Sequence, residues 1–214
     1  MRPLLRSRGH ELFTPTYTGL GERAHLAHKG IDLETHIADV LGLLQYEDLR
    51  DIVLLGHSYG GMVATGVADR AAERVSRLVY LDAFVPHDGQ ALMDLVSPEA
   101  RAARRKAMDA GGEGWLIPPN PLAPDTSAED VAWARPLRRM QPAQTFMQPI
   151  RLSGRVEKLR RTYIYCQRKS GEDPFRQFAD RLRTDSAWQY FELDASHSPH
   201  ITAPRELAAL LDRP

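Results

Sequence analysis

Apolar runs alternate with helical stretches through the first half of the chain. Residues 51–55 contain four consecutive apolar residues, two of them β-branched, which is typical of a parallel strand covered on both faces. Residues 61–68 follow as a helix with small residues along one side, and residues 75–81 form a second apolar strand. Because a strand, a helix and a strand at this spacing form a βαβ unit, the pattern predicts a parallel sheet.

Further elements follow from the same periodicities. A helix capped by Asp32 has apolar residues at i, i+4, i+7, i+8 and i+11 from Leu33, so we expect one face to pack on the sheet. His36 falls outside this series and is predicted at the surface. The remaining predicted elements are a helix at 1–8 stopped by Gly9, a strand at 11–16, strands at 161–166 and 188–193, a helix at 174–183 and a closing helix from Pro204. The predicted fold class is α/β, a mostly parallel sheet flanked by helices.

The segment from about 84 to 154 has a different character. Proline interrupts it repeatedly, strand patterns are absent, and residues 98–109 and 128–140 are helical in composition. An insertion of this kind between two sheet strands predicts a helical cap folded over the site. With 214 residues and 43% hydrophobic content, we expect one domain, 1–214, that contains this cap.

Charge and composition exclude several classes of partner. The 28 basic residues balance 28 acidic ones, so no overall field favours nucleic acid or an anionic membrane. No apolar run approaches the roughly 20 residues of a membrane-spanning helix, and no signal-peptide apolar region is found. The single cysteine, Cys166, excludes an internal disulfide and is expected in the core. We expect a soluble cytoplasmic protein whose partner is small and weakly charged.

The motif G-H-S-Y-G at residues 56–60 lies between the first predicted strand and the helix after it. In this setting G-x-S-x-G forms a nucleophile elbow, a strained turn that presents the serine at the end of the strand. Gly56 and Gly60 are expected to let the strand and helix pack closely. The alternative is a glycine-rich turn in which Ser58 is an ordinary helix cap.

The chain resembles the α/β-hydrolases, in particular the branch of plant methylesterases, hydroxynitrile lyases and related bacterial esterases. Besides the elbow, the resemblance rests on R-G-H-E-L-F-T-P-T at 8–16, T-G-L-G-E-R at 18–23, Y-L-D-A-F-V-P at 80–86 and A-S-H-S-P at 195–199. It implies serine hydrolase chemistry without a metal or organic cofactor. In this family, strands and a His-Gly loop precede the helix at 1–8, so the resemblance implies an N-terminally shortened member that lacks the N-terminal strands.

A serine hydroxyl needs a base that takes its proton during attack, and histidine suits this role near neutrality. The chain order serine, acid, histidine in the family points to His197 as the base for Ser58, with His200 as the alternative. The backbone N–H of Tyr59 is expected as one oxyanion donor. The resemblance implies that the second donor belongs to the missing loop, which predicts weak turnover.

Two residues are candidates for the acid of the triad. Asp82 ends the strand after the nucleophile helix, so it leaves the same sheet edge as Ser58. Asp173 follows the strand at 161–166, the position that most of the family uses. Asp82 is favoured because its apolar neighbours hold it rigidly and partly desolvate it, so its carboxylate needs a partner such as an imidazole N–H.

The candidates for a substrate pocket are His57, Phe84, Trp115, Trp133 and Phe146. Packing of the cap is the alternative for each aromatic residue, and packing or loop hydrogen bonding is the alternative for His57. His25 and His28 could share a metal, but no third ligand lies near them in the sequence. No metal site is predicted.

Two classes of function remain. The first is an esterase that cleaves a small ester through an acyl-serine. The second is a non-catalytic or crippled relative that binds a small apolar ligand beneath its cap. A hydroxynitrile lyase is less favoured, because that branch has a lysine directly after its histidine where this chain has Ser198. The unpaired edge expected near 11–16 also predicts a homo-oligomer.

Overall fold

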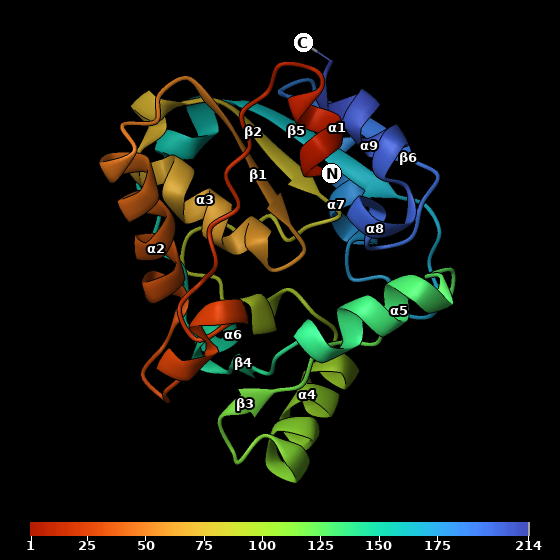
Figure 1. Cartoon of the computed structure of the whole chain (residues 1–214). Coiled ribbons are helices and arrows are strands. Elements are labelled where there is room, and N and C mark those ends of the chain that lie inside the picture. Colours follow the sequence, from red (N-terminus) through yellow and green to blue (C-terminus); the bar gives the residue numbers. More distant parts are fainter. Residues whose placement is uncertain (214) are drawn as a thin grey trace.

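A computed structural model gives the fold of the chain and describes residues 1–213. Its centre is a sheet of four strands, all parallel to their neighbours (Figure 1). Their order across the sheet is β1 (Ile52–His57), β2 (Val75–Leu81), β5 (Arg160–Cys166) and β6 (Trp188–Leu193). The predicted α/β class with a parallel sheet is confirmed. Because the strands are parallel, their carboxyl ends meet at one edge, where ligands bind in sheets of this kind.

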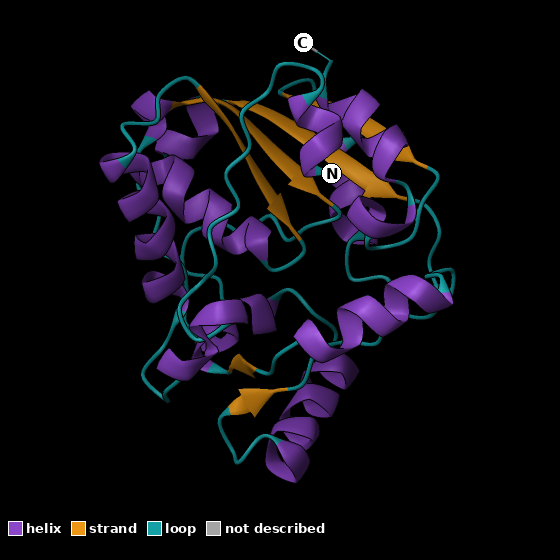
Figure 2. Cartoon of the chain, viewed as in Figure 1, coloured by secondary structure: helices purple, strands orange, loops and turns teal. Residues whose placement is uncertain are grey.

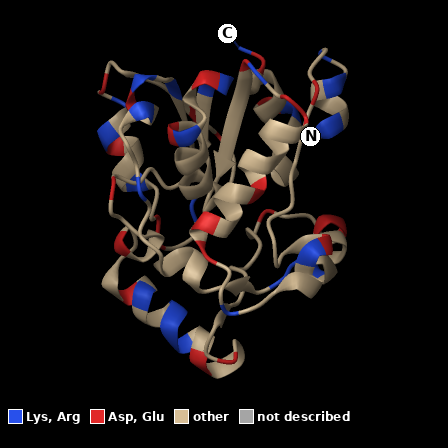
Figure 3. Cartoon of the chain, turned by 90° about the vertical axis from the view of Figure 1, so that its left-hand side faces the viewer, with Lys and Arg blue, Asp and Glu red and all other residues tan. Residues whose placement is uncertain are grey.

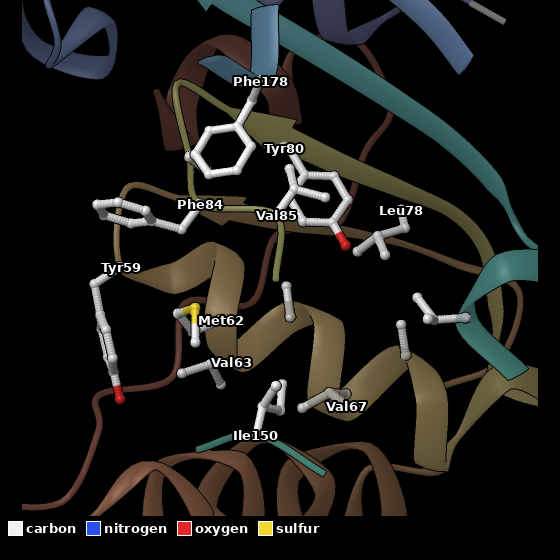
Figure 4. Close-up of a cluster of buried hydrophobic side chains, with 14 of the residues drawn as sticks. Tyr59, Met62, Val63, Val67, Leu78, Tyr80, Phe84, Val85, Ile150 and Phe178 are labelled. Carbon is white, nitrogen blue, oxygen red and sulfur yellow. The ribbon is translucent and has the colours of Figure 1, made fainter. Parts of the chain in front are cut away.

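Helices cover both faces of the sheet (Figure 2). Packed on one face are α2 (Leu33–Tyr46), α3 (Gly60–Arg70) and α7 (Arg176–Leu182), and packed on the other are α1 (Arg2–Arg6) and α9 (Pro204–Leu211). Alternate strand residues divide between the two cores, since Leu78 and Tyr80 belong to the first and Val79 and Leu81 to the second. Figure 4 shows part of the first core, with Tyr80 of β2 above side chains of α3. The short connecting elements are η1 (Gly21–Leu26), η2 (Ala72–Arg74) and α8 (Pro199–Thr202).

Most of the segment between β2 and β5 lies beyond the carboxyl ends of the strands, and its last part returns past α3 to the start of β5 (Figure 1). Its elements are η3 (Leu92–Asp94), α4 (Pro98–Gly111), β3 (Leu116–Ile117), α5 (Ala128–Ala134), η4 (Arg135–Leu137), β4 (Gln141–Pro142), α6 (Gln144–Met147) and η5 (Arg155–Lys158). α5 is shorter than predicted because Pro136 interrupts it. β3 and β4 pair antiparallel, and the sequence did not predict them because two residues show no periodicity.

Two predictions for the N-terminal part are wrong. Residues 11–16 form no strand, because they are mostly exposed, have no apolar face, and include Pro15, which has no N–H to donate. His36 is not at the surface but fully buried. It lies three residues after Leu33 and next to Ile37, so it shares their face of α2.

The edge strands of the sheet are β1 and β6, and β1 is the one on the side where the strand at 11–16 was expected. Within the described residues β1 pairs only with β2, and its side chains Val53 and Leu55 are 51% and 37% exposed. The expected self-association stays a prediction, and β1 is the edge it concerns. Elsewhere the surface is mixed in charge, with basic and acidic residues interspersed (Figure 3). No helix in residues 1–213 has the length and apolarity to cross a membrane.

Candidate active site

Ser58 lies in a sharp turn between β1 and α3. Its φ is 56°, in the left-handed region that non-glycine residues rarely adopt. Three backbone hydrogen bonds hold it there: its N–H donates to Leu81, and its carbonyl accepts from Gly61 and Phe84. This is the geometry of a nucleophile elbow, and Ser58 is not a cap, because no side-chain cap bond is made at the start of α3.

The close approach of strand and helix requires Gly56 and Gly61. A Cβ at Gly56 would lie 2.4 Å from the carbonyl oxygen of Gly60, and one at Gly61 would lie 2.2 Å from that of Phe84. At Gly60, by contrast, the nearest atom would be the Tyr17 hydroxyl at 3.6 Å. The expectation that Gly60 is needed for packing is therefore wrong, since the second tight position is one residue later.

His197, in the loop after β6, faces Ser58. Its Nε2 lies 3.0 Å from Ser58 Oγ, and its Nδ1 lies 2.7 Å from Asp82 Oδ2. A carboxylate only accepts hydrogen bonds, so Nδ1 carries the proton and Nε2 is left to accept one from Ser58. The Phe175 ring stacks on the imidazole, with centroids 4.9 Å apart and planes at 13°.

Asp82 has no exposed side-chain surface, and its φ of 42° turns the chain sharply at the end of β2. Besides His197, its carboxylate accepts from the Cys166 N–H at 3.2 Å and from Lys169 Nζ at 2.6 and 2.7 Å. Asp173 contacts a different set of groups: it accepts from the Tyr165 hydroxyl and the Phe175 N–H, and is 3.4 Å from Lys169. Of the two candidate acids, the structure brings only Asp82 to His197.

His57 connects β1 with the histidine loop. Its Nε2 donates to the His197 carbonyl at 2.6 Å, and its ring lies between those of His197 and His200. Desolvation first, then the neighbouring imidazoles, lowers the pKa of His57 well below its usual value. Burial likewise lowers the pKa of His200. His57 thus stays neutral and positions His197 through its backbone, a hydrogen-bonding role and not a substrate contact.

Tyr59 has its backbone and its side chain in different surroundings. Its hydroxyl donates to His36 Nδ1 at 2.9 Å, while His36 Nε2 donates to the Thr18 carbonyl. Burial raises the pKa of Tyr59 well above its usual value and lowers that of His36, so both are neutral. The Tyr59 N–H makes no hydrogen bond within residues 1–213, and is free to donate to a ligand.

A cavity of about 780 Å³ opens at Ser58 and His197. One wall is α4, which contributes Ala100, Ala103, Arg104 and Ala107, and the rest comes from the proline-rich loop 117–125 and the loop 168–175. Sequence reasoning missed these walls. The signal was present in α4, where the lining residues follow i, i+3, i+4 and i+7.

Of the predicted pocket aromatics, only Phe84 lines this cavity. Trp133 is 62% exposed, because the one residue that α5 buries is Ala134. Phe146 packs against the Tyr59 ring at 5.3 Å and so joins the cap to the elbow. Trp115 does not line the cavity, and its backbone carbonyl accepts a hydrogen bond from Ala143 within the cap. The pocket assignments of Trp115, Trp133 and Phe146 are therefore corrected. No cluster of metal-ligating residues occurs among residues 1–213.

A parallel sheet, a strained serine elbow and a histidine held between that serine and a buried aspartate define an α/β-hydrolase. The chain matches the model of the Alpha/beta hydrolase family over residues 1–210, and it belongs to this family. It is 40% identical over 219 residues to the carbendazim hydrolyzing esterase of Nocardioides sp. (strain SG-4G), covering 97% of this chain and 89% of that protein. The polyneuridine aldehyde esterase of Rauvolfia serpentina is 25% identical, covering 99% of this chain and 87% of that protein.

Solved structures agree with this assignment. An extracellular α/β-hydrolase from a Paenibacillus species matches with a TM-score of 0.83 at 25% identity, covering 98% of this chain and 89% of that one. The predicted family, and the prediction of an enzyme of the carboxylic ester hydrolase type, are confirmed by these relatives.

Proposed function

We propose that the chain is a serine esterase that hydrolyses small, weakly charged carboxylic esters through an acyl-Ser58 intermediate. The observation that carries the proposal is the unbroken contact from Ser58 Oγ through His197 to Asp82, at 3.0 and 2.7 Å. These side chains follow three different strands of one sheet, so their meeting is a product of the fold and not of local sequence. A serine activated in this way is a nucleophile.

In the first half of the reaction, Ser58 Oγ attacks the ester carbonyl while His197 Nε2 takes the hydroxyl proton. The Nδ1–H of His197 stays hydrogen-bonded to Asp82, whose negative charge stabilises the imidazolium. The imidazolium gives its proton to the departing alcohol, which leaves an ester of Ser58. In the second half, Nε2 takes a proton from water as its oxygen attacks the acyl carbon. The acid then leaves, and Ser58 Oγ takes the proton back from the imidazolium.

The negative charge that develops on the carbonyl oxygen needs donors that are already in position. The Tyr59 N–H is one, because it follows the nucleophile and has no partner within residues 1–213. The bond from the Tyr59 hydroxyl to buried His36 fixes the side chain of the same residue. Both features support Tyr59 as an oxyanion donor.

The cavity supports a substrate of low net charge. Most of its charged side chains are paired: Lys169 with Asp82 and Asp173, and Arg168 with Asp125 and with Asp194 outside the cavity. The other charged residues of the lining are Arg104 and Glu172. The remaining surface is largely alanine, proline and other apolar residues. An ester with an apolar acyl or alcohol part fits such walls better than an ionic substrate.

The test uses a fluorophosphonate probe and a short-chain p-nitrophenyl ester. We expect the parent protein to be labelled and to release p-nitrophenol, and Ser58→Ala to do neither. Ser170→Ala is the matched control, because Ser170 lines the same cavity without contacting His197, and it should retain both activities. Labelling that persists in Ser58→Ala would refute the proposal.

The choice of substrates follows from the relatives. Carbendazim belongs in the panel because a relative that is 40% identical is named for hydrolysing it. Labelling of the parent without turnover of any ester would instead support the binding role of a crippled hydrolase.

A further inference from the structure

Lys169 lies directly against the acid of the triad. Its Nζ is 2.6 Å from one oxygen of Asp82 and 2.7 Å from the other, and its side chain is 17% exposed. The ammonium lies over two aromatic rings, with Nζ 4.6 Å from the Tyr165 centroid and 5.2 Å from that of Phe175. The ammonium is therefore held in place and is not a mobile surface charge.

With Lys169 included, every acceptor position of the Asp82 carboxylate has a donor. A carboxylate has about four acceptor positions. One oxygen accepts from Lys169 and the Cys166 N–H, and the other accepts from Lys169 and His197 Nδ1. The lysine thus removes the rotational freedom that the Asp82 carboxylate would otherwise have.

The same contact changes the electrostatics of the base. An aspartate stabilises the imidazolium because its charge is uncompensated. Here the Lys169 ammonium shares that charge at hydrogen-bond distance, so Asp82 stabilises an imidazolium less than a carboxylate without this lysine would. Lys169 also acts on the wider histidine cluster, since its charge is among the causes that lower the pKa of His57.

We propose that Lys169 is a positioning residue that clamps the Asp82 carboxylate and shares its negative charge, and that this contact sets the acid limb of the pH profile of kcat/KM. The proposal rests on the esterase function proposed above. It accounts for the position of Lys169, in the loop after β5 and in contact with both Asp82 and Asp173. Asp173, at 3.4 Å, is then the second acidic partner of Lys169.

Other groups near His197 cannot account for the same effect. Asp82, His57 and His200 face its ring or its loop directly, with Lys169 behind Asp82 and Asp173 behind Lys169. The ion pair of Arg168 with Asp194 lies at the exposed side of the loop, and the N-terminal amino group acts on His200. The two histidines are desolvated and neutral. Lys169 is thus the fixed cation nearest to the pair of Asp82 and His197.

The experiment compares pH profiles of kcat/KM for Lys169→Met, Lys169→Gln, Lys169→Arg and the parent, with a p-nitrophenyl ester. Loss of the charge should move the midpoint of the acid limb upward by about one pH unit in both neutral variants, because Asp82 then stabilises the imidazolium without competition. Lys169→Arg keeps the charge and should leave the midpoint where it is. Lys158→Met is the control, since Lys158 is exposed and precedes β5 at the opposite edge of the sheet.

A lysine that only supported the fold would lower activity equally at every pH. An unmoved acid limb in both neutral variants, or an equal shift in Lys158→Met, would overturn the proposal. If neither neutral variant folds, the contact between Lys169 and Asp82 serves stability alone, and this result would also count against the proposal.

An NMR titration of the His197 ring in the parent and Lys169→Gln gives the same comparison without turnover. This titration separates the two proposals. If the parent is inactive but the His197 ring titrates differently in Lys169→Gln, the esterase function is refuted and the role of Lys169 is not.

Discussion

The two adjacent glycines at the start of α3 allow a matched test of how tightly the elbow is packed. In Gly61→Ala the new methyl would lie 2.2 Å from the Phe84 carbonyl oxygen and 3.0 Å from the Ala83 side chain. A backbone oxygen cannot rotate away as a side chain does, so the loop after Asp82 has to move by about 1 Å to reach van der Waals contact. In Gly60→Ala the nearest atom would be 3.6 Å away.

The free energies of unfolding should separate the two variants clearly. Overpacking of this kind costs about 1–3 kcal/mol. At both positions alanine restricts the unfolded chain and favours the helix by up to about 1 kcal/mol, so this gain cancels in the comparison. We therefore expect Gly61→Ala to be about 1–3 kcal/mol less stable than Gly60→Ala. Because the Phe84 N–H donates to the Ser58 carbonyl, Gly61→Ala should also slow fluorophosphonate labelling.

Urea unfolding followed by circular dichroism measures this difference, provided that the m-value is the same in both variants. The labelling rate of the folded protein gives the second readout. Equal midpoints for the two variants would refute the argument from packing. If Gly60→Ala is the less stable variant, the position that tolerates no side chain is Gly60 and not Gly61.

Two further predictions concern the acid and the histidines. Asp82→Asn should reduce kcat/KM roughly a thousandfold or more, whereas Asp173→Asn should stay within about tenfold of the parent; the reverse order would make Asp173 the acid. The free energy of unfolding should fall as the pH drops below about 6.5. Burial lowers the pKa of three histidines in the folded chain, so below this pH the unfolded chain binds protons that the folded chain does not. Each of these histidines can reduce the free energy of unfolding by up to about 1.4 kcal/mol per pH unit. These histidines are His36, His57 and His200. Urea midpoints at pH 7.5 and 5.5 check this, and equal values would contradict it.

The sheet and the meeting of Ser58 with Asp82 could be predicted because each depends on a rule of local pattern. A buried apolar run predicts a strand, a βαβ unit predicts parallel neighbours, and parallel neighbours bring their carboxyl ends to one edge. The burial of His36 follows from the same kind of rule, because a residue three positions after Leu33 lies on the same helix face, although His36 falls outside the apolar series.

Other features depend on the paths of loops, which have no periodicity. Whether Lys169 turns inward to Asp82 or outward to water is decided by the course of residues 167–175, and nothing in their composition indicates it. The same holds for Trp133, where the rotation of a short helix decides exposure. The tight contact at Gly61 also comes from a segment distant in sequence, the loop after β2.

The position of the long insertion has a consequence for evolvability. The chain leaves the sheet after Asp82 and re-enters at β5, whose residues pair in register with β2 from Arg77 with Arg160 to Leu81 with Ile164. The contact of Asp82 with Lys169 joins the two sides of this gap at the surface where chemistry takes place. Residues between them form most of the substrate walls and none of the triad. Selectivity and reactivity are thus carried by separable parts of one chain, so that changes in α4 or the proline-rich loop can give new substrate ranges while the reaction is inherited unchanged.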